Sequence, residues 1–99
     1  MITRIVKMEI KPEAIDTFMD IFSHHAINME SVAGCMTLQL LQNDPEATIF
    51  FTISTWQRQE DLENYRQSEL FSAVWSKVKP LFCARPQAWT TQSIYHGKN

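Results

Sequence analysis

Residues 50–71 have the sequence FFTISTWQRQEDLENYRQSELF, and this stretch decides the fold class. Aromatic and β-branched residues lead up to Trp56, so the pattern predicts a strand that ends there. A polar turn follows, and then two short helical segments with Ser68 between them. Serine is a preferred N-cap residue, so Ser68 is expected to begin the second segment. The stretch therefore predicts a strand followed by a broken helix.

Outside this stretch, the spacing of apolar residues predicts the remaining elements. Two-residue alternation predicts strands over 2–10, 35–42 and 48–56, and a last strand over 89–95. Three- and four-residue spacing predicts a long helix over 13–31. The order strand, helix, two strands, broken helix, strand is that of the ferredoxin-like β-α-β-β-α-β folds. We therefore expect the whole chain of 99 residues to form one α+β domain with an antiparallel sheet.

The first two predicted strands each place several apolar residues on one face. In the first strand, Arg4 is the exception on a face that carries Ile2, Val6, Met8 and Ile10. In the second strand, alternation assigns one face to Met36, Leu38 and Leu40.

Bulky side chains fall on both faces of the third predicted strand. Ile49, Phe51 and Ile53 point one way, whereas Phe50 and Trp56 point the other way. Because one layer of helices covers only one face of a sheet, a second copy of the sheet is expected to cover the other. We therefore predict a homodimer that buries at least about 1,200 Å² in total.

The composition excludes several classes of protein. The net charge is −2 and the basic residues are scattered, so neither nucleic acid nor a membrane surface is an expected partner. No apolar run approaches the ~20 residues that span a bilayer. The N-terminus lacks the apolar block of a signal peptide, and two cysteines, Cys35 and Cys83, are too few for a disulfide framework. We expect a cytoplasmic protein with two reduced thiols.

Neither a metal site nor a cofactor site is visible in the sequence. No histidine or carboxylate lies at ligand spacing from either cysteine. The only glycines are Gly34 and Gly97, so there is no glycine-rich phosphate loop. We therefore expect no metal and no cofactor.

Two neighbouring histidines in the predicted long helix differ in their surroundings. His25 follows Phe18 by seven residues and precedes Met29 by four, which places it on the apolar stripe. Such a histidine is either a core residue satisfied by a hydrogen bond or a base that lines a pocket. His24 lies four residues after Asp20 on the polar side, where a solvated pair is expected.

Aromatic residues frame the broken helix. Tyr65 and Trp75 both have polar tips, and an apolar pocket with a few hydrogen-bonding tips suits a flat aromatic ligand. Packing in the core is the alternative for these residues. We take His25 and Tyr65 as candidate catalytic residues. The candidate substrate-binding residues are Trp56, Trp75, Phe71 and Phe22.

From Ile5 to about Ile94, the chain resembles the antibiotic biosynthesis monooxygenase family. The resemblance rests on Lys11-Pro12-Glu13, Gly34-Cys35, Trp56 and the run DLENYRQSELF over 61–71. It implies a ferredoxin-like homodimer, described as a dimeric α+β barrel. It also implies oxidation of a small aromatic or quinol by molecular oxygen without metal or flavin. The protein then has to bind the substrate, remove a proton and exclude water.

The chain departs from this family at positions that carry chemistry. Many members have histidines where Tyr65 and Leu70 stand, and a haem-degrading branch has its haem-ligating histidine where Trp75 stands. We therefore predict no tight haem binding. The working hypothesis is a cofactor-independent monooxygenase, and the alternative is a non-catalytic dimeric module that binds a small apolar ligand. A titratable group inside an enclosed cavity favours catalysis over binding alone.

Overall fold

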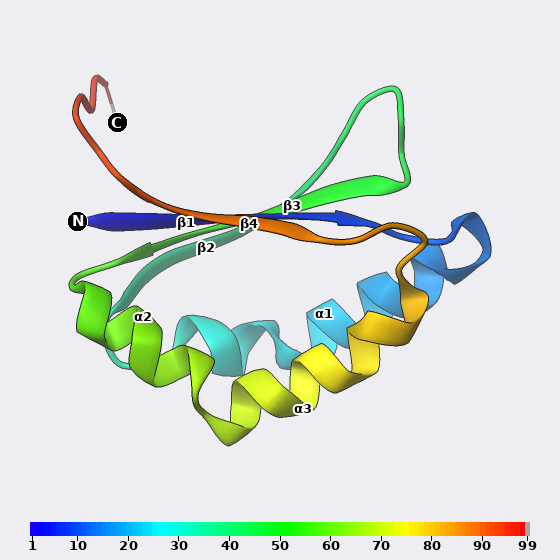
Figure 1. The fold of residues 1–99 in the computed structure, drawn as a ribbon, viewed down its shortest axis with the longest axis horizontal. Coiled ribbons are helices and arrows are strands. Elements are labelled where there is room, and N and C mark those ends of the chain that lie inside the picture. Colours follow the sequence, from blue (N-terminus) through cyan, green and yellow to red (C-terminus); the bar gives the residue numbers. More distant parts are fainter. Residues whose placement is uncertain (99) are drawn as a thin grey trace.

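The elements lie in two layers, a sheet and a set of helices (Figure 1). A computed structural model describes residues 1–98. The antiparallel sheet has the strand order β2-β3-β1-β4. Its strands are β1 (Ile2–Glu9), β2 (Cys35–Gln42), β3 (Ile49–Trp56) and β4 (Gln87–Gln92). The helices are α1 (Ile15–Glu30), α2 (Gln59–Arg66) and α3 (Glu69–Val78), with short 3-10 turns η1 (Pro12–Ala14) and η2 (Lys79–Leu81). This arrangement confirms the predicted ferredoxin-like α+β fold.

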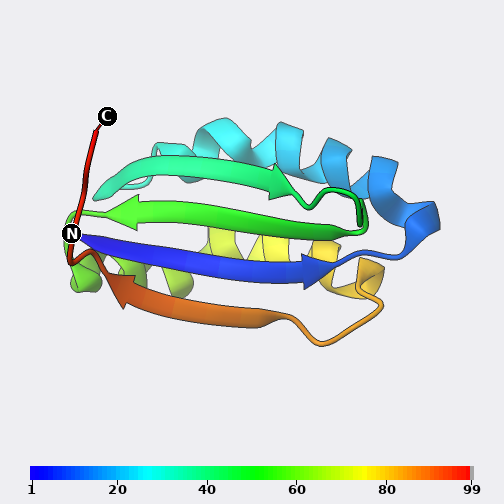
Figure 2. The same cartoon turned by 90° about the horizontal axis from the view of Figure 1, so that it is seen from above.

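All three helices cover the same face of the sheet (Figure 1). Seen from above, with the helix-free face of the sheet toward the viewer, the four strands lie in front of the helices (Figure 2). Helix α1 lies behind the β2 edge, and α2 and α3 lie behind β1 and β4 (Figure 2). None of the helices in residues 1–98 is long and apolar enough to cross a membrane.

Local signals explain where the helices begin and end. Pro12 opens η1, which leads directly into α1, because proline is tolerated in a first helical turn. Ser68 caps α3 as predicted: the backbone N–H of Phe71 donates to Ser68 Oγ at 3.1 Å. Pro80 lies in η2, immediately after α3 ends. Gly34, between α1 and β2, has φ +86°, a conformation that favours glycine.

The core lies between the sheet and the helices. Phe18 of α1 packs on Phe50 of β3, with ring centroids 4.8 Å apart. The other buried members of this cluster are Met8, Ile10, Ala14 and Val78. Phe50 and Trp56 of β3 therefore face the helices, and Ile49, Phe51 and Ile53 point to the open face, as their alternation predicts.

Two strand predictions need correction. Met36 does not share a face with Leu38 and Leu40, because the register between β2 and β3 shifts between Cys35 and Thr37. The irregularity leaves Met36 54% exposed, while Cys35 lines the interior. Strand β4 also differs, since it ends at Gln92, and Tyr95 lies beyond it. β4 ends there because its partner β1 begins at Ile2, which pairs with Gln92.

Candidate functional site

A cavity of about 310 Å³ lies between the inner face of the sheet and the helices. The strands contribute small residues such as Val6, Thr52 and Ser54, and the helices contribute larger apolar ones such as Phe22 and Leu62. A cavity of this size is at the lower end of the range for small-molecule sites. It therefore suits a compact ligand.

Aromatic rings form one continuous wall of this cavity. The Trp56 ring stacks on Tyr65 with centroids 5.3 Å apart, and Tyr65 meets Phe71 edge to face at the same distance. Phe71 in turn stacks on Trp75 at 5.9 Å. These four residues and Phe22 all line the cavity. The structure thus brings together Tyr65 and every residue that we predicted to bind substrate.

The polar tips of the wall differ in what they can offer a ligand. Trp56 Nε1 donates to Ser54 Oγ at 2.9 Å, so this indole N–H is already satisfied within the protein. Burial raises the pKa of Tyr65 to about 12. Tyr65 is therefore a neutral phenol at physiological pH, able to donate a hydrogen bond but not to serve as a base.

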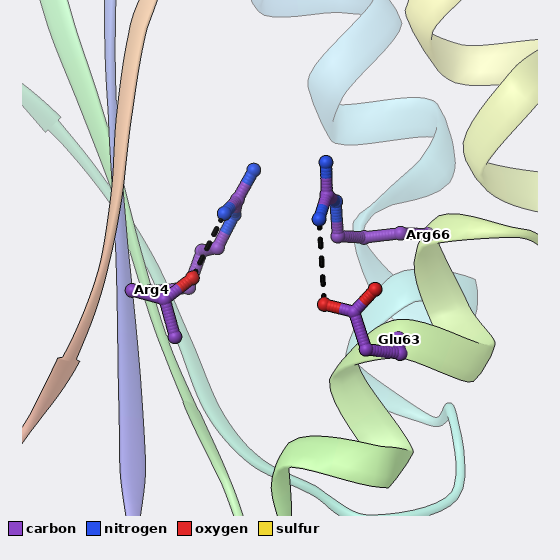
Figure 3. A network of polar contacts seen from close by, with 4 residues as sticks. Arg4, Glu63 and Arg66 are labelled. Carbon is purple, nitrogen blue, oxygen red and sulfur yellow. Dashed lines mark hydrogen bonds and ion pairs between the residues drawn. The ribbon is translucent and has the colours of Figure 1, made fainter.

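Two arginines from different elements also line the cavity. Arg4 extends from β1 and Arg66 from the end of α2 into the space between sheet and helices (Figure 3). Arg4 Nη1 donates to Thr90 Oγ1 at 3.0 Å, and Arg66 Nη1 donates to Glu63 Oε1 at 3.3 Å. Burial, and then the nearby charge of Arg66, lower the pKa of Arg4.

Cys35 is the remaining ionisable residue of the lining. Burial, followed by the charge of Glu30, raises the pKa of its thiol. A protonated thiol is a poor nucleophile and behaves as a small apolar residue, which agrees with the interpretation from sequence. Cys83 is exposed and lies away from the lining.

His25 is not among the residues that line the cavity. Its Nε2 lies 3.2 Å from Lys77 Nζ of α3, and the His24 ring stands edge-on to it at 5.0 Å. Partial burial and then the Lys77 charge lower the pKa of His25, so the imidazole is neutral at physiological pH. Within residues 1–98, His24 forms no ion pair with Asp20.

Sequence reasoning did not include the two arginines among the candidate site residues. Arg4 had a usable signal, because it stands on the otherwise apolar face of the first strand. Arg66 had none, since it belongs to a short polar helix in which a charged residue is unremarkable. Over the described residues, no group of three His, Cys, Asp or Glu side chains could hold a metal ion.

Comparisons with known proteins agree on the fold. The family model described as antibiotic biosynthesis monooxygenase matches residues 1–76. Among proteins with curated descriptions, none matches this sequence.

Several solved structures share the architecture over nearly their whole length. A conserved protein from Methanosarcina mazei has a TM-score of 0.88 at 16% identity, covering 92% of this chain and 90% of that one. A candidate antibiotic biosynthesis monooxygenase from Nitrosomonas europaea has 0.89 at 15% identity, covering 96% and 100%. A third structure, described as an antibiotic biosynthesis monooxygenase, has 0.89 at 18% identity with the same coverage. At these identities the similarity establishes the fold alone.

Proposed function

The chain belongs to the antibiotic biosynthesis monooxygenase family, and on that premise we propose that it oxidises a small aromatic or quinol with molecular oxygen and without a cofactor. The observation that carries this proposal is the cavity of about 310 Å³ with one continuous aromatic wall. Flat rings stack well on such a wall, and its apolar lining limits the access of water.

The proposed reaction balances without an external reductant. For a hydroquinone, one atom of O₂ is inserted into a ring C–H bond. The other atom leaves as water with the two phenolic hydrogens, and the product is a hydroxyquinone. All of the electrons that reduce oxygen come from the substrate. The protein's task is then to bind the ring, assist proton loss and hold the anion that reacts with oxygen.

Individual residues have distinct roles in this proposal. Trp56, Phe71, Trp75 and Phe22 bind the ring by stacking and apolar contact. Tyr65 donates a hydrogen bond to a substrate oxygen, a role that suits a phenol with a pKa of about 12. The role of His25 as a base stays a prediction from the sequence, because its imidazole contacts Lys77 and does not line the cavity.

We also propose that the protein acts as a homodimer through the open face of its sheet. Ile5 of β1 pairs with Ile53 on one side and Trp89 on the other, and Phe51 pairs with Leu41. These residues form an apolar band across all four strands, and Trp89 is 45% exposed in the single chain. A second sheet packed on this band removes it from water.

An oxygen electrode tests the proposed reaction. Purified protein is screened with dihydroquinones and polyphenols, with and without a chelator, and the product is identified by mass. We expect oxygen consumption that does not depend on the chelator. Val74→Phe, which fills the cavity, should abolish it, whereas Ala73→Phe on the exposed side of α3 should not. Equal activity in the two variants contradicts the proposed site.

A non-catalytic binding module is the second candidate. One observation favours it: the ionisable residues of the lining are Arg4, Cys35, Tyr65 and Arg66, and none of them is a base at physiological pH. In that case an aromatic compound binds, and Val74→Phe blocks its binding, but no oxygen is consumed with any of the compounds screened.

A further inference from the structure

We propose that the ligand of this cavity is an aromatic oxyanion, whose ring lies on the aromatic wall and whose negative oxygen lies between Arg4 and Arg66. The inference rests on the proposed function, since it specifies the class of compound that the same site accepts. It adds a charge requirement that the aromatic wall alone does not supply.

The first step is that two guanidinium groups, 62 positions apart in the sequence, line one small cavity. Arg4 belongs to the inner face of the sheet, where its neighbours Val6 and Met8 line the same cavity. Arg66 is the last residue of α2, directly after Tyr65 of the aromatic wall. Figure 3 shows the two arginines in the space between sheet and helices, and the rings of the aromatic wall line the same cavity.

The second step concerns how these charges are balanced. Arg4 donates to a neutral hydroxyl, that of Thr90, and no carboxylate of residues 1–98 forms an ion pair with it. Arg66 pairs with Glu63, but both side chains are about two-fifths exposed, at 41% and 43%. Exposed pairs of this kind contribute little. Two cations share one nearby carboxylate, which leaves a net positive charge at the cavity.

The third step is that, apart from Glu63, the ionisable residues beside the arginines offer no competing anion. Cys35 and Tyr65 both have raised pKa values and stay neutral at physiological pH. Guanidinium groups stay charged and present several N–H donors in a plane, which matches the two oxygens of a carboxylate or one phenolate oxygen. Because the rest of the lining is mostly apolar, a ring with a single oxyanion fits better than a phosphate or a sugar.

Binding of two matched probes tests the charge requirement. 1-Naphthoate and 1-naphthamide have the same ring and nearly the same shape, but only the first is an anion. Affinities are measured by titration calorimetry with the full chain at low salt. We expect 1-naphthoate to bind at least about tenfold more tightly, the effect of one charge-assisted hydrogen bond. This preference should weaken as salt is added, because the Arg66 side chain is 41% exposed to solvent.

Variants assign the preference to the two arginines. Arg4→Met and Arg66→Gln should each remove most of the preference for 1-naphthoate while leaving the affinity for 1-naphthamide nearly unchanged. Arg4→Lys should keep part of it. Arg58→Gln is the matched control, because Arg58 pairs with Asp61 and does not line the cavity. If Arg4→Met fails to fold, Arg66→Gln still tests the inference.

A third probe shows whether the oxyanion is a phenolate of the reacting ring or a separate carboxylate. 4-Nitrophenol is coloured only as its phenolate, so absorbance gives the pKa of the bound compound. A lowered pKa on binding supports a phenolate of the reacting ring between the arginines. An unchanged pKa, together with a preference for 1-naphthoate, supports a separate carboxylate.

Equal binding of 1-naphthoate and 1-naphthamide overturns the inference but leaves the proposed function standing. If no probe binds, the small-ligand site itself is wrong.

Discussion

Trp56 and Tyr65 stack with ring centroids 5.3 Å apart and planes inclined by 27°. Trp56 ends β3 and Tyr65 lies in the last turn of α2, so this pair joins the sheet to the helical layer, and both residues line the cavity. The indole N–H is held by Ser54 at 2.9 Å, which fixes the orientation of the Trp56 ring. The Tyr65 ring also meets Phe71 edge to face at 5.3 Å, so it packs against two other rings.

Tyr65→Phe should reduce the loss of folding stability that the protein shows at alkaline pH. Burial raises the pKa of Tyr65 from 10.0 to about 12. Between these two values the folded protein keeps the Tyr65 proton, whereas the unfolded chain loses it. The free energy of unfolding therefore falls as the pH rises from 10.0 to about 12. The contribution is at most about 3 kcal/mol. Urea unfolding near neutral pH and above the pKa of free tyrosine measures it. Tyr95→Phe, at an 86% exposed position, should leave the alkaline loss unchanged.

Substitution of the two histidines tests the base predicted from the sequence. Loss of a general base typically costs ~10²–10⁴-fold in rate. The contact of His25 with Lys77, outside the cavity lining, leads us to expect small and equal effects of His25→Ala and His24→Ala on turnover. A large loss confined to His25→Ala supports the base role, provided that circular dichroism shows the same fold.

Lys77→Met should raise the pKa of His25 toward 6.5, its ordinary value. Burial and the Lys77 ammonium both disfavour the imidazolium, and the substitution removes the second of these causes. An NMR titration of the imidazole protons measures the change. Lys79→Met, at an exposed position two residues away, is the control. An unchanged His25 pKa in Lys77→Met means that this lysine does not influence it.

Gly34→Ala should destabilise the protein by at least about 1–2 kcal/mol, the cost of a left-handed conformation for a residue with a Cβ atom. Gly34 has φ +86°, and an added Cβ meets the side chain of Asp61, which is itself paired with Arg58 at 3.7 Å. Denaturant unfolding measures the loss. Gly97→Ala meets only ordinary contacts with Tyr95 and should change stability by no more than about 0.5 kcal/mol.

The open sheet face should determine the oligomeric state. Ile53 lies in the apolar band on β3, between β1 and β2. Ile53→Lys places a charge there, and we expect it to convert a dimer into a monomer. Sedimentation velocity at micromolar concentration gives the mass of each species. Thr17→Lys, on the exposed side of α1, is the matched control. A stable monomer of the unsubstituted protein would falsify the dimer.

The sequence determined by itself the features that depend on neighbours along the chain. The order of elements, the N-cap at Ser68, the turn at Gly34 and the alternation of β3 all follow from spacing and from local backbone preferences. The aromatic residues around the broken helix belong here too, because helical spacing already places Phe71 and Trp75 on one side.

Only the tertiary structure decided which distant residues meet. The irregularity between Cys35 and Thr37 depends on how β2 pairs with β3, and it moved Met36 to the surface. The packing of α1 against α3 gave His25 its neighbour Lys77, 52 positions away, outside the cavity lining. The placement of α2 behind β1 and β4 put Arg66 into the same cavity as Arg4 (Figure 2). Such contacts depend on the rotation and register of whole elements, which are set by packing of the complete core and not by any local pattern.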